Sequence, residues 1–548
     1  MLLDRISYID KLTSIVEDRS KFKLIDTDVY KHILKIETKI NNFLRSLKTN
    51  VLSESVYRSL YSSGTIPGTL YGLPKTHKPD LPLRPILSAI NSPTYKLAKY
   101  LIPFIQPTTS NQYSVRDSFH MCELLKNLSF KECFMTSFDI ESLFTNVPVK
   151  ETIDIIVNSL FQSGNRLDGF SSTQFKKMLN LSTQDTVFLF NNALYQQIEG
   201  MAMGSPLGPS FANSFLSYHE ESWLSDCPCE FKPLLYRRYV DDCFVVFKKP
   251  EHASLFLQYL NSKHVSIKFT KENEINNKLS FLDINIELIN GKFHTSVYRK
   301  PTFTLLGTNF FSSLMPKFKF SSISCRIDRA FKICSNWNLF HKEMVYLKNF
   351  YKVNLFPDEI FDRILNNYLL EIFRPKLPSY DVPKEKIFIK LPYIGSQTND
   401  LIHSLKSLLN PIYPQCDFRF LAINSQNLGK FFSVKDKIPV LLKSCVVYKY
   451  QCASCNACYV GQTILQLKTR IQKHKGLSFR TGRPVSHPET SAIRSHMEIN
   501  NHLIHNQDFK ILKTFSTETD GRILESLYIK SLSPSLNDNS SSIQLHTF

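Results

Sequence analysis

The chain has 548 residues, and at roughly 100–200 residues per domain it should hold about three to five compact units. Lysines and arginines number 67 against 48 aspartates and glutamates, and the resulting net charge of +19 indicates a polyanionic partner. With 43% hydrophobic and 12% aromatic residues the chain can build hydrophobic cores, which excludes a largely disordered polyelectrolyte.

Hydropathy and cysteine usage indicate an intracellular protein. No stretch approaches the roughly 18 consecutive apolar residues of a membrane span, and the first residues lack the apolar core of a signal peptide. We therefore expect no membrane association. Of the 12 cysteines, Cys452, Cys455 and Cys458 are crowded together, and the others are scattered without the spacing of a disulfide framework. Free thiols plus one metal-binding cluster fit this pattern better than disulfides.

The first hundred residues change from a helical to a turn-rich pattern. Residues 1–60 predict helix, because apolar residues recur at helical spacing from Ile33 to Leu47. Glycines and prolines then punctuate residues 64–110, where Lys75 and Arg84 are expected on rigid basic loops.

The remainder predicts a mixed core, a helical region and a second small domain. Strand-like runs at 134–140 and 235–247 are separated by helical stretches, which favours an α/β or α+β core. Helical spacing returns from about 336 to 373. Prolines and mixed polarity in residues 379–440 indicate a connector with some structure, and a small domain is expected to begin near Lys443.

Two groups of acidic residues interrupt apolar, strand-like runs. Asp241 and Asp242 follow Tyr239-Val240 and would lie at the tip of a hairpin, where adjacent carboxylates are costly unless a cation compensates them. Aspartate is also common in turns, so the pair alone has a plain structural reading. Asp139 lies in similar surroundings about a hundred residues earlier. Carboxylates from separate strands are what two-metal phosphoryl transfer requires, with the ions about 3.5–4 Å apart.

The order of these motifs resembles the reverse transcriptases. Phe138-Asp139, then Gly204-Ser205-Pro206, then Tyr239-Val240-Asp241-Asp242 resemble the family's motifs A, B and C. The small residues around Gly204 permit close approach of a ligand or strand, although a loop before a helix has the same composition. The fingers motifs of the family resemble the segments 71–79 and 83–86, and its later palm and primer-side motifs resemble the segments 279–283 and 298–302.

That resemblance implies roles for individual residues. Asp139 and Asp241 would hold two Mg²⁺ (or Mn²⁺) ions, with Asp242 as the third catalytic carboxylate. Phe144, five positions after Asp139, would lie beneath the incoming sugar and exclude a 2′-hydroxyl, so deoxynucleotides are the expected substrates. Lys75 and Arg84 would neutralise the triphosphate, and Gly204, Ser205 and Pro206 would help to bind the substrate. Core packing for Phe144 and surface solvation for the two cations are the plain alternatives.

Two strand motifs in the C-terminal region read Val-Val-Tyr448 and Tyr459-Val-Gly, and Arg470 and His474 are four apart on one helical face. Glu525 follows in an amphipathic helix, and then Asn537. This set resembles the GIY-YIG endonucleases, with Val-Val-Tyr as a departure from Gly-Ile-Tyr. The resemblance implies that Glu525 holds one divalent cation, that Tyr448 or Tyr459 activates or orients water, that Arg470 stabilises developing charge and that His474 joins a proton relay. Ordinary strand tyrosines and a solvated glutamate are the plain readings.

A zinc site is expected inside this region. Cys452-x2-Cys455 is followed about forty residues later by His496-x5-His502, and two thiolates with two imidazoles make a closed, structural Zn²⁺ site. Cys458, His487 and His505 are nearby competitors, and ordinary free cysteines are the alternative. The spacing to Tyr459 resembles the insertion of Penelope-like retroelements.

Taken together, the motifs resemble a Penelope-like element polyprotein, whose polymerase is related to telomerase. The implied fold is multidomain α+β: a right-hand reverse transcriptase with fingers, palm and helical thumb, followed by a small α/β GIY-YIG endonuclease domain with a zinc-binding insertion. The expected boundaries are an N-terminal helical segment (1–60), fingers and palm (61–300), thumb (301–378), linker (379–440) and endonuclease (441–548). The extension that precedes the polymerase in this family is expected to be short or missing.

The expected function is RNA-directed DNA synthesis for a retrotransposon. The nuclease would nick target DNA, and the freed 3′-hydroxyl would prime copying of the element's RNA. The implied partners are an RNA template, a DNA primer, target DNA and deoxynucleoside triphosphates, and these substrates indicate the nucleus. Two alternatives stay open: an inactive or partly active copy that only binds nucleic acid, and a polymerase that uses chromosome ends with an idle nuclease.

Overall fold

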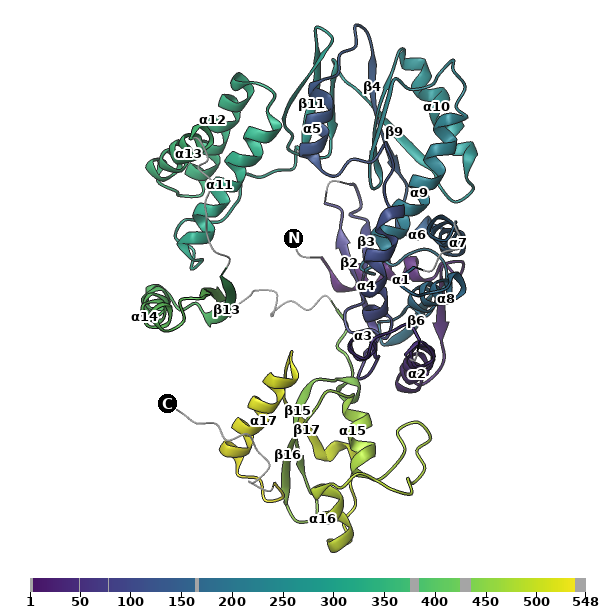
Figure 1. Cartoon of the computed structure of the whole chain (residues 1–548), viewed down its shortest axis with the longest axis vertical. Helices are drawn as coiled ribbons and strands as arrows, with labels where there is room; N and C mark the ends of the chain where they lie inside the picture. Colours follow the sequence, from purple (N-terminus) through teal and green to yellow (C-terminus); the bar gives the residue numbers. More distant parts are fainter. Residues whose placement is uncertain are drawn as a thin grey trace. The chain divides into compact units, whose positions relative to one another are not determined.

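A computed structural model describes residues 3–48, 50–76, 78–162, 167–374, 384–423 and 435–537. The chain divides into two compact units (Figure 1). Unit 1 takes Met1–Asn111, Ser142–Ser222 and Val434–Phe548, and unit 2 takes Gln112–Glu141 and Trp223–Ser433. The region predicted as fingers and palm therefore contributes to both units, and the C-terminal region shares a unit with the N-terminal helices.

Unit 1 begins with helices α1 (Arg5–Val16), α2 (Val29–Leu47) and α3 (Glu54–Leu60), where the helical pattern predicts them. The side chains of Asp4, Asp28 and Ser53 each accept a hydrogen bond from a backbone amide of the first turn, which fixes where the helices start. Between α1 and α2 lies a short strand, β1 (Phe22–Ile25), which the helical pattern does not indicate.

A five-stranded sheet runs in the order β1-β6-β5-β2-β3. Its strands β2 (Gly68–Pro74) and β5 (Val187–Phe190) are parallel, and the other neighbours are antiparallel, with β3 (Leu83–Ser88) and β6 (Ala193–Gln197) at or near the edges. Buried side chains from α2 and the surrounding helices share one apolar core with this sheet. These helices are α4 (Tyr95–Ile105), α7 (Val149–Leu160), α8 (Ser172–Thr183) and α9 (Gly208–Ser225), with the short α6 (Leu143–Asn146) before α7.

The C-terminal part of unit 1 is a small α/β layer. Its antiparallel sheet runs β16-β15-β17, with bounds Cys458–Thr463, Val446–Gln451 and Phe509–Thr514. Helices α15 (Leu467–His474) and α17 (Glu518–Leu532) flank the sheet (Figure 1), and α16 (Ala492–Asn500) follows a long loop. Tyr448, Leu467, Ile471 and Phe509 lie in its apolar core.

Unit 2 is built on the four-stranded antiparallel sheet β7-β8-β4-β9. The strands are β4 (Phe134–Ile140), β7 (Leu235–Tyr239), β8 (Asp242–Phe247) and β9 (Phe269–Asn273). Helix α10 (Pro250–Lys263) places Phe256 against Phe138 and Phe247 on one face. Phe244 and Val246 pack on the other face with α5 (Ser118–Lys126) and the sheet of β10 (Lys278–Phe281), β11 (Ile284–Ile289) and β12 (Lys292–Val297). Burial on both faces explains the unbroken apolar run of β8.

Three helices and a βαβ unit complete unit 2. The helices are α11 (Pro316–Ile333), α12 (Trp337–Val353) and α13 (Asp358–Phe373), and the prolines expected to end them, from Pro375 to Pro383, lie outside the described residues. Within the predicted connector, β13 (Glu385–Pro392) and β14 (Cys416–Ile423) pair in parallel across helix α14 (Ser396–Ile412). The connector is thus a folded βαβ unit over 384–423. In the described ranges, no helix combines the length and apolarity that crossing a membrane requires.

Candidate active sites

Asp139, Asp241 and Asp242 come together in unit 2. The backbones of Asp139 on β4 and Asp242 on β8 are direct partners in the antiparallel ladder, and the amide of Ile140 donates to the carbonyl of Asp241 at 3.1 Å. Phe138 and Ile140 are buried on either side of Asp139, whose own side chain is exposed. The backbones of three acidic residues therefore lie near one another where β4 ends and the β7–β8 hairpin turns.

The hairpin turn itself is held by a buried arginine. Val240 has a φ of 54°, a left-handed conformation that a β-branched residue rarely adopts. The guanidinium of Arg238, 2% exposed, donates to the carbonyl of Val240 at 3.1 Å. The turn is thereby fixed in the conformation that presents Asp241 beside Asp139.

The carboxylates repel one another. Burial, followed by the charges of Asp241 and Asp139, raises the pKa of Asp242 to about 6, and Lys300 opposes this shift. Acidic groups this close favour a divalent cation, because its charge offsets both the desolvation and the mutual repulsion. The acidic residues here offer carboxylate oxygens, which are ligands that suit Mg²⁺ or Mn²⁺.

The predicted substrate-binding residues lie in unit 1. Lys75 follows β2, and its amide donates to the carbonyl of Pro82 at 2.9 Å across the β2–β3 hairpin. Arg84 on β3 pairs with Leu73 on β2 and has an exposed side chain. His77, part of the same motif, lies outside the described residues.

Gly204 and Phe144 lie in one neighbourhood of unit 1. Gly204 has a φ of +117°, and a Cβ there would lie 2.1 Å from the carbonyl oxygen of Leu87 on β3, so only glycine fits. The Phe144 ring would lie 3.6 Å from a Cβ on Gly208, and the carbonyl of Phe144 accepts from Met201. The loop that contains Ser205 and Pro206 is thus bounded by Gly204 against β3 and by Gly208 near Phe144.

A second group of predicted residues meets in the C-terminal layer. The backbones of Tyr448 and Gly461 are direct partners in the β15–β16 ladder. A Cβ at Gly461 would lie 2.8 Å from the Tyr448 hydroxyl and 2.6 Å from the Tyr459 ring. Glycine here lets the two tyrosines approach, with ring centroids 6.4 Å apart.

Tyr448 faces inward, toward α15. It is fully buried, and its hydroxyl lies 2.8 Å from Nε2 of His474 and accepts from Nε of Arg470 at 3.2 Å. Burial raises the pKa of Tyr448, and Arg470 opposes the shift. Burial, followed by the charge of Arg470, lowers the pKa of His474 to about 3, so this imidazole is neutral at physiological pH.

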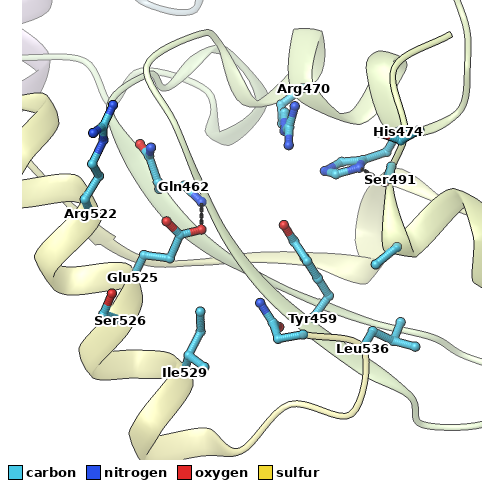
Figure 2. Close-up of a pocket in the computed structure, with 13 residues that line it drawn as sticks. Tyr459, Gln462, Arg470, His474, Ser491, Arg522, Glu525, Ser526, Ile529 and Leu536 are labelled. Atoms are coloured by element: carbon cyan, nitrogen blue, oxygen red, sulfur yellow. Dashed lines mark hydrogen bonds between the residues drawn. The ribbon is translucent and has the colours of Figure 1, made fainter. Parts of the chain in front are cut away.

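A cavity of about 460 Å³ opens beside these residues. Tyr459, Arg470 and Glu525 point toward the same space (Figure 2). The backbone amide of Gln462 donates to Glu525 at 3.0 Å, while burial raises the pKa of this carboxyl. Asn537 also lines the cavity, but its amide bonds to the backbone N–H and C=O of Val460, so it holds the chain after α17 against β16.

Sequence reasoning missed several residues of this cavity. Gln462, Ser491 and Arg522 line it, and the Ser491 hydroxyl lies 2.5 Å from Nδ1 of His474. Glu489 pairs with Lys473 at 2.6 Å and reaches Arg470 at 3.5 Å. The only available signal was the N-cap preference of serine before α16.

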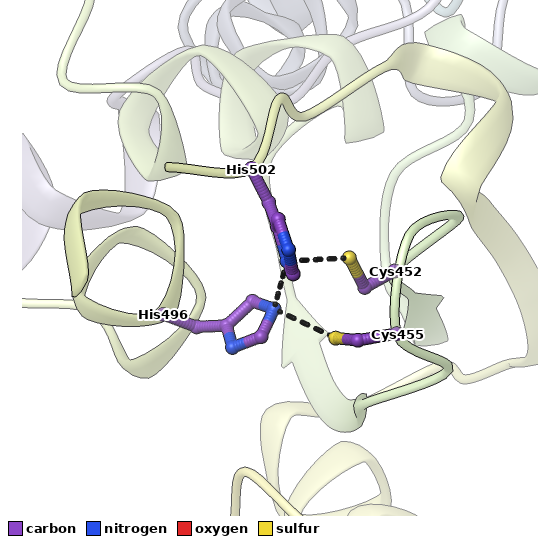
Figure 3. A group of neighbouring side chains, drawn as sticks. All are labelled: Cys452, Cys455, His496 and His502. Atoms are coloured by element: carbon purple, nitrogen blue, oxygen red, sulfur yellow. Dashed lines mark hydrogen bonds between the residues drawn. The ribbon is translucent and has the colours of Figure 1, made fainter. Parts of the chain in front are cut away.

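Cys452, Cys455, His496 and His502 form a group that could hold a metal ion (Figure 3). Their ligand atoms all lie within 4.8 Å of one another. Burial acts to raise the pKa of Cys452, but the nearby His496 and hydrogen bonds from backbone amides outweigh it and lower the pKa. A thiolate is the form that binds metal. Cys458 is not part of the group, and its amide donates to Ser535.

Comparison with known proteins matches one region to a family. Residues 76–307 match the family described as "Reverse transcriptase (RNA-dependent DNA polymerase)". No match was found among the curated proteins.

Solved structures of polymerases are also similar to the chain. Telomerase of Candida albicans with a fragment of telomeric RNA is 12% identical, with a TM-score of 0.42 over 65% of this chain and 68% of that one. A truncated apo telomerase of Candida Tropicalis is 14% identical, with a TM-score of 0.33 over 47% of this chain and 59% of that one. A Sicinivirus RNA-dependent RNA polymerase is 13% identical, with a TM-score of 0.37 over 64% and 87%. The chain thus spans about three fifths of the truncated telomerase.

His474 should make the C-terminal layer less stable in acid. Its pKa is about 3 when folded and about 6.5 when unfolded, so it has no effect above pH 6.5, and below that only the unfolded chain takes the proton. From pH 7 to pH 5 this should cost about 2 kcal/mol of unfolding free energy. Hydrogen exchange of β15 amides measures that loss, which His474→Gln should reduce. Equal losses in both proteins would contradict it.

Proposed function

Because residues 76–307 match the reverse transcriptase family, we propose that the chain is the RNA-directed DNA polymerase of a retrotransposon, with a C-terminal endonuclease that nicks target DNA. The observation that best supports the polymerase activity is that the backbones of Asp139, Asp241 and Asp242 lie near one another at the end of a buried sheet. Their repulsion makes the site incomplete without divalent cations.

In the proposed reaction the protein's task is positioning. Asp139 and Asp241 would hold two Mg²⁺ or Mn²⁺ ions, which supply activation of the primer's 3′-hydroxyl and stabilisation of the leaving pyrophosphate. Arg238 keeps the turn that presents Asp241 rigid. Phe144 would exclude a ribose 2′-hydroxyl, and Lys75 and Arg84 would bind the triphosphate. The substrates are therefore an RNA template, a DNA primer and deoxynucleotides.

The proposed endonuclease uses the C-terminal cavity. Glu525 would hold one divalent cation, which lowers the pKa of a bound water and offsets phosphate charge. Arg470 would stabilise the charge that develops on the phosphate. Tyr459 lines the cavity, whereas the hydroxyl of Tyr448 is already engaged by His474 and Arg470. We therefore propose that Tyr459 orients the water. Tyr448 and His474 would hold the Arg470 side chain in place.

The Cys452, Cys455, His496 and His502 group suits Zn²⁺ in a structural role. Two thiolates and two imidazoles would hold the ion, and such a set supplies the four ligands of a structural zinc site. The ion would tie the end of β15 to α16, whose N-cap residue Ser491 lies beside His474. Zinc would thus stabilise the loop that borders the cavity.

The combination supports assignment to the Penelope-like elements. A nick made by the C-terminal domain leaves a 3′-hydroxyl, which is the primer that the polymerase needs. The net charge of +19 suits a protein that binds template, primer and target, and binding should weaken steeply with salt. We propose a nuclear location, because target DNA is found there.

Asp241→Asn should abolish DNA synthesis. Loss of one carboxylate removes a metal ligand, so extension of a DNA primer on an RNA template with Mg²⁺ should fall at least about 100-fold. The exposed Asp226, replaced with Asn, is the matched control and should leave extension unchanged. Equal extension by the parent chain and Asp241→Asn would refute the assignment of this residue.

Glu525→Gln should abolish nicking of supercoiled DNA while primer extension is retained, because only the C-terminal site loses its metal ligand. Glu498→Gln, an exposed residue of the same layer, serves as the control. If neither the parent chain nor Glu525→Gln nicks DNA, the endonuclease proposal fails and a polymerase with an idle nuclease is favoured.

The purified chain should contain about one zinc per molecule, measured by atomic spectroscopy. Cys452→Ser should reduce this content severalfold and accelerate hydrogen exchange in α16, because the ligands of the structural site are incomplete. Cys229→Ser changes an exposed cysteine and should bind zinc like the parent. Identical zinc content in all three proteins would exclude the four-residue site.

A further inference from the structure

Helix α2 buries a second face in addition to the one that lines the core. Ile33, Ile36 and Ile40 belong to the large apolar core of unit 1. A separate stripe on the same helix is also buried, although it carries polar groups. It consists of Tyr30, Leu34, Glu37 and Asn41, whose exposed fractions are 5%, 8%, 7% and 5%. The residues that cover this stripe include segments of the C-terminal layer of the same unit.

Glu37 is the centre of this contact. Its Oε1 accepts from the amide of Thr65 at 2.8 Å, from the Thr65 hydroxyl at 2.7 Å and from Nε2 of Gln466 at 3.3 Å. The Gln466 amide also donates to the Thr65 carbonyl at 2.9 Å, and Gln466 is 1% exposed. Burial raises the pKa of Glu37, and the hydrogen bonds from Thr65 and Gln466 lower it. Removing such donors leaves a buried carboxyl unsatisfied, which is costly.

The network continues onto α15. The Thr469 hydroxyl donates to Oε1 of Gln466 at 3.1 Å, which leaves Tyr30 to donate its hydroxyl hydrogen to Thr469 at 2.9 Å. Lys468 lies over the Tyr30 ring, 4.5 Å from its centroid. Side chains of α2 thus contact the N-cap residue and the first turns of α15.

The backbones approach too closely for any side chain at Gly64. This glycine has a φ of +65°, and a Cβ there would lie 2.2 Å from the carbonyl oxygen of Ile464. Asn41 fixes the segment before it through two hydrogen bonds with the Ser62 backbone, at 2.6 and 2.8 Å. Leu442 and Phe479 of the C-terminal layer pack beside Tyr30. The contact is therefore close-packed as well as hydrogen-bonded.

The helix that is held in this way also carries two residues of the C-terminal cavity. Residues four apart are neighbours on a helix, so Arg470 lies beside Gln466, and His474 lies beside Arg470. The face of α15 that carries Arg470 and His474 is therefore next to the face formed by Gln466 and Thr469. A helix of 8 residues has little stability of its own, so its position depends on tertiary contacts.

We infer that α2, through Glu37 and Gln466, positions the catalytic helix of the C-terminal nuclease, so that nicking requires this layer to be seated on the N-terminal helices of the polymerase chain. The inference rests on the proposed nuclease. Glu37 and Gln466 are positioning residues, because neither is a source of chemistry in the cavity. Nicking is then a property of the chain that includes the N-terminal helices, and not of the C-terminal layer alone.

The test is a charge exchange across the contact. Gln466→Glu places two carboxyls side by side and should lower the kcat of nicking about tenfold with little change in KM, because displaced catalytic groups cost rate. It should also speed hydrogen exchange in α15. The double variant Glu37→Gln/Gln466→Glu restores one donor and should recover both readouts to within about threefold. Gln507→Glu, an exposed position in the same layer, is the matched control.

Primer extension and zinc content should be unchanged in every variant, and this result would show that the chains are folded. Nicking and α15 exchange that are the same in Gln466→Glu as in the parent would overturn the inference, as would a double variant no better than the single one. If the parent chain does not nick DNA, the proposed nuclease fails, and α15 exchange in the charge-exchange pair still decides whether α2 holds the helix.

Discussion

Electrostatic repulsion among carboxylates is the constraint on which the polymerase site depends. Asp139, Asp241 and Asp242 are brought together by the ladder between β4 and β8, two strands that are buried on both faces. Burial, together with the neighbouring charges, raises the pKa of Asp242 to about 6. The apolar packing stabilises the sheet at the same time as it concentrates negative charge at its end. A divalent cation would resolve this conflict, and it is the cofactor that the proposed chemistry uses.

The C-terminal layer uses a different arrangement. Helix α15 contacts both the cavity and α2. One face places Arg470 and His474 at the cavity, and the adjacent face is hydrogen-bonded to α2 through Gln466 and Thr469. The buried hydrogen bonds of Glu37 are satisfied only when both partners are in place. Such a contact has little tolerance for displacement, which is why we regard the C-terminal layer as an integral part of unit 1 and not as a tethered module.

How far the sequence could predict this structure differs from one element to the next. The β7–β8 hairpin follows from local features, because two aspartates interrupt a strongly apolar run and leave few alternatives to a turn. The spacing of Cys452 and Cys455 likewise predicts metal ligands from neighbouring residues alone. The βαβ unit of residues 384–423 was predicted only as a connector, since the alternation of Ile387, Ile389 and Leu391 is short and its pairing partner lies beyond a helix. Glu37 and Gln466 are 429 positions apart, and neither carries a local sign of burial.

The central claim is that one chain cuts DNA and then copies RNA from the cut. It is tested most directly by incubating the full chain with supercoiled plasmid, an RNA template, deoxynucleotides and Mg²⁺, and by sequencing across plasmid–cDNA junctions. The account predicts DNA strands in which new cDNA is joined covalently to the plasmid 3′-end at the nick, and predicts that separate inactivation of Asp241 or Glu525 removes them. Synthesis of cDNA that is never joined to the nicked strand would contradict it.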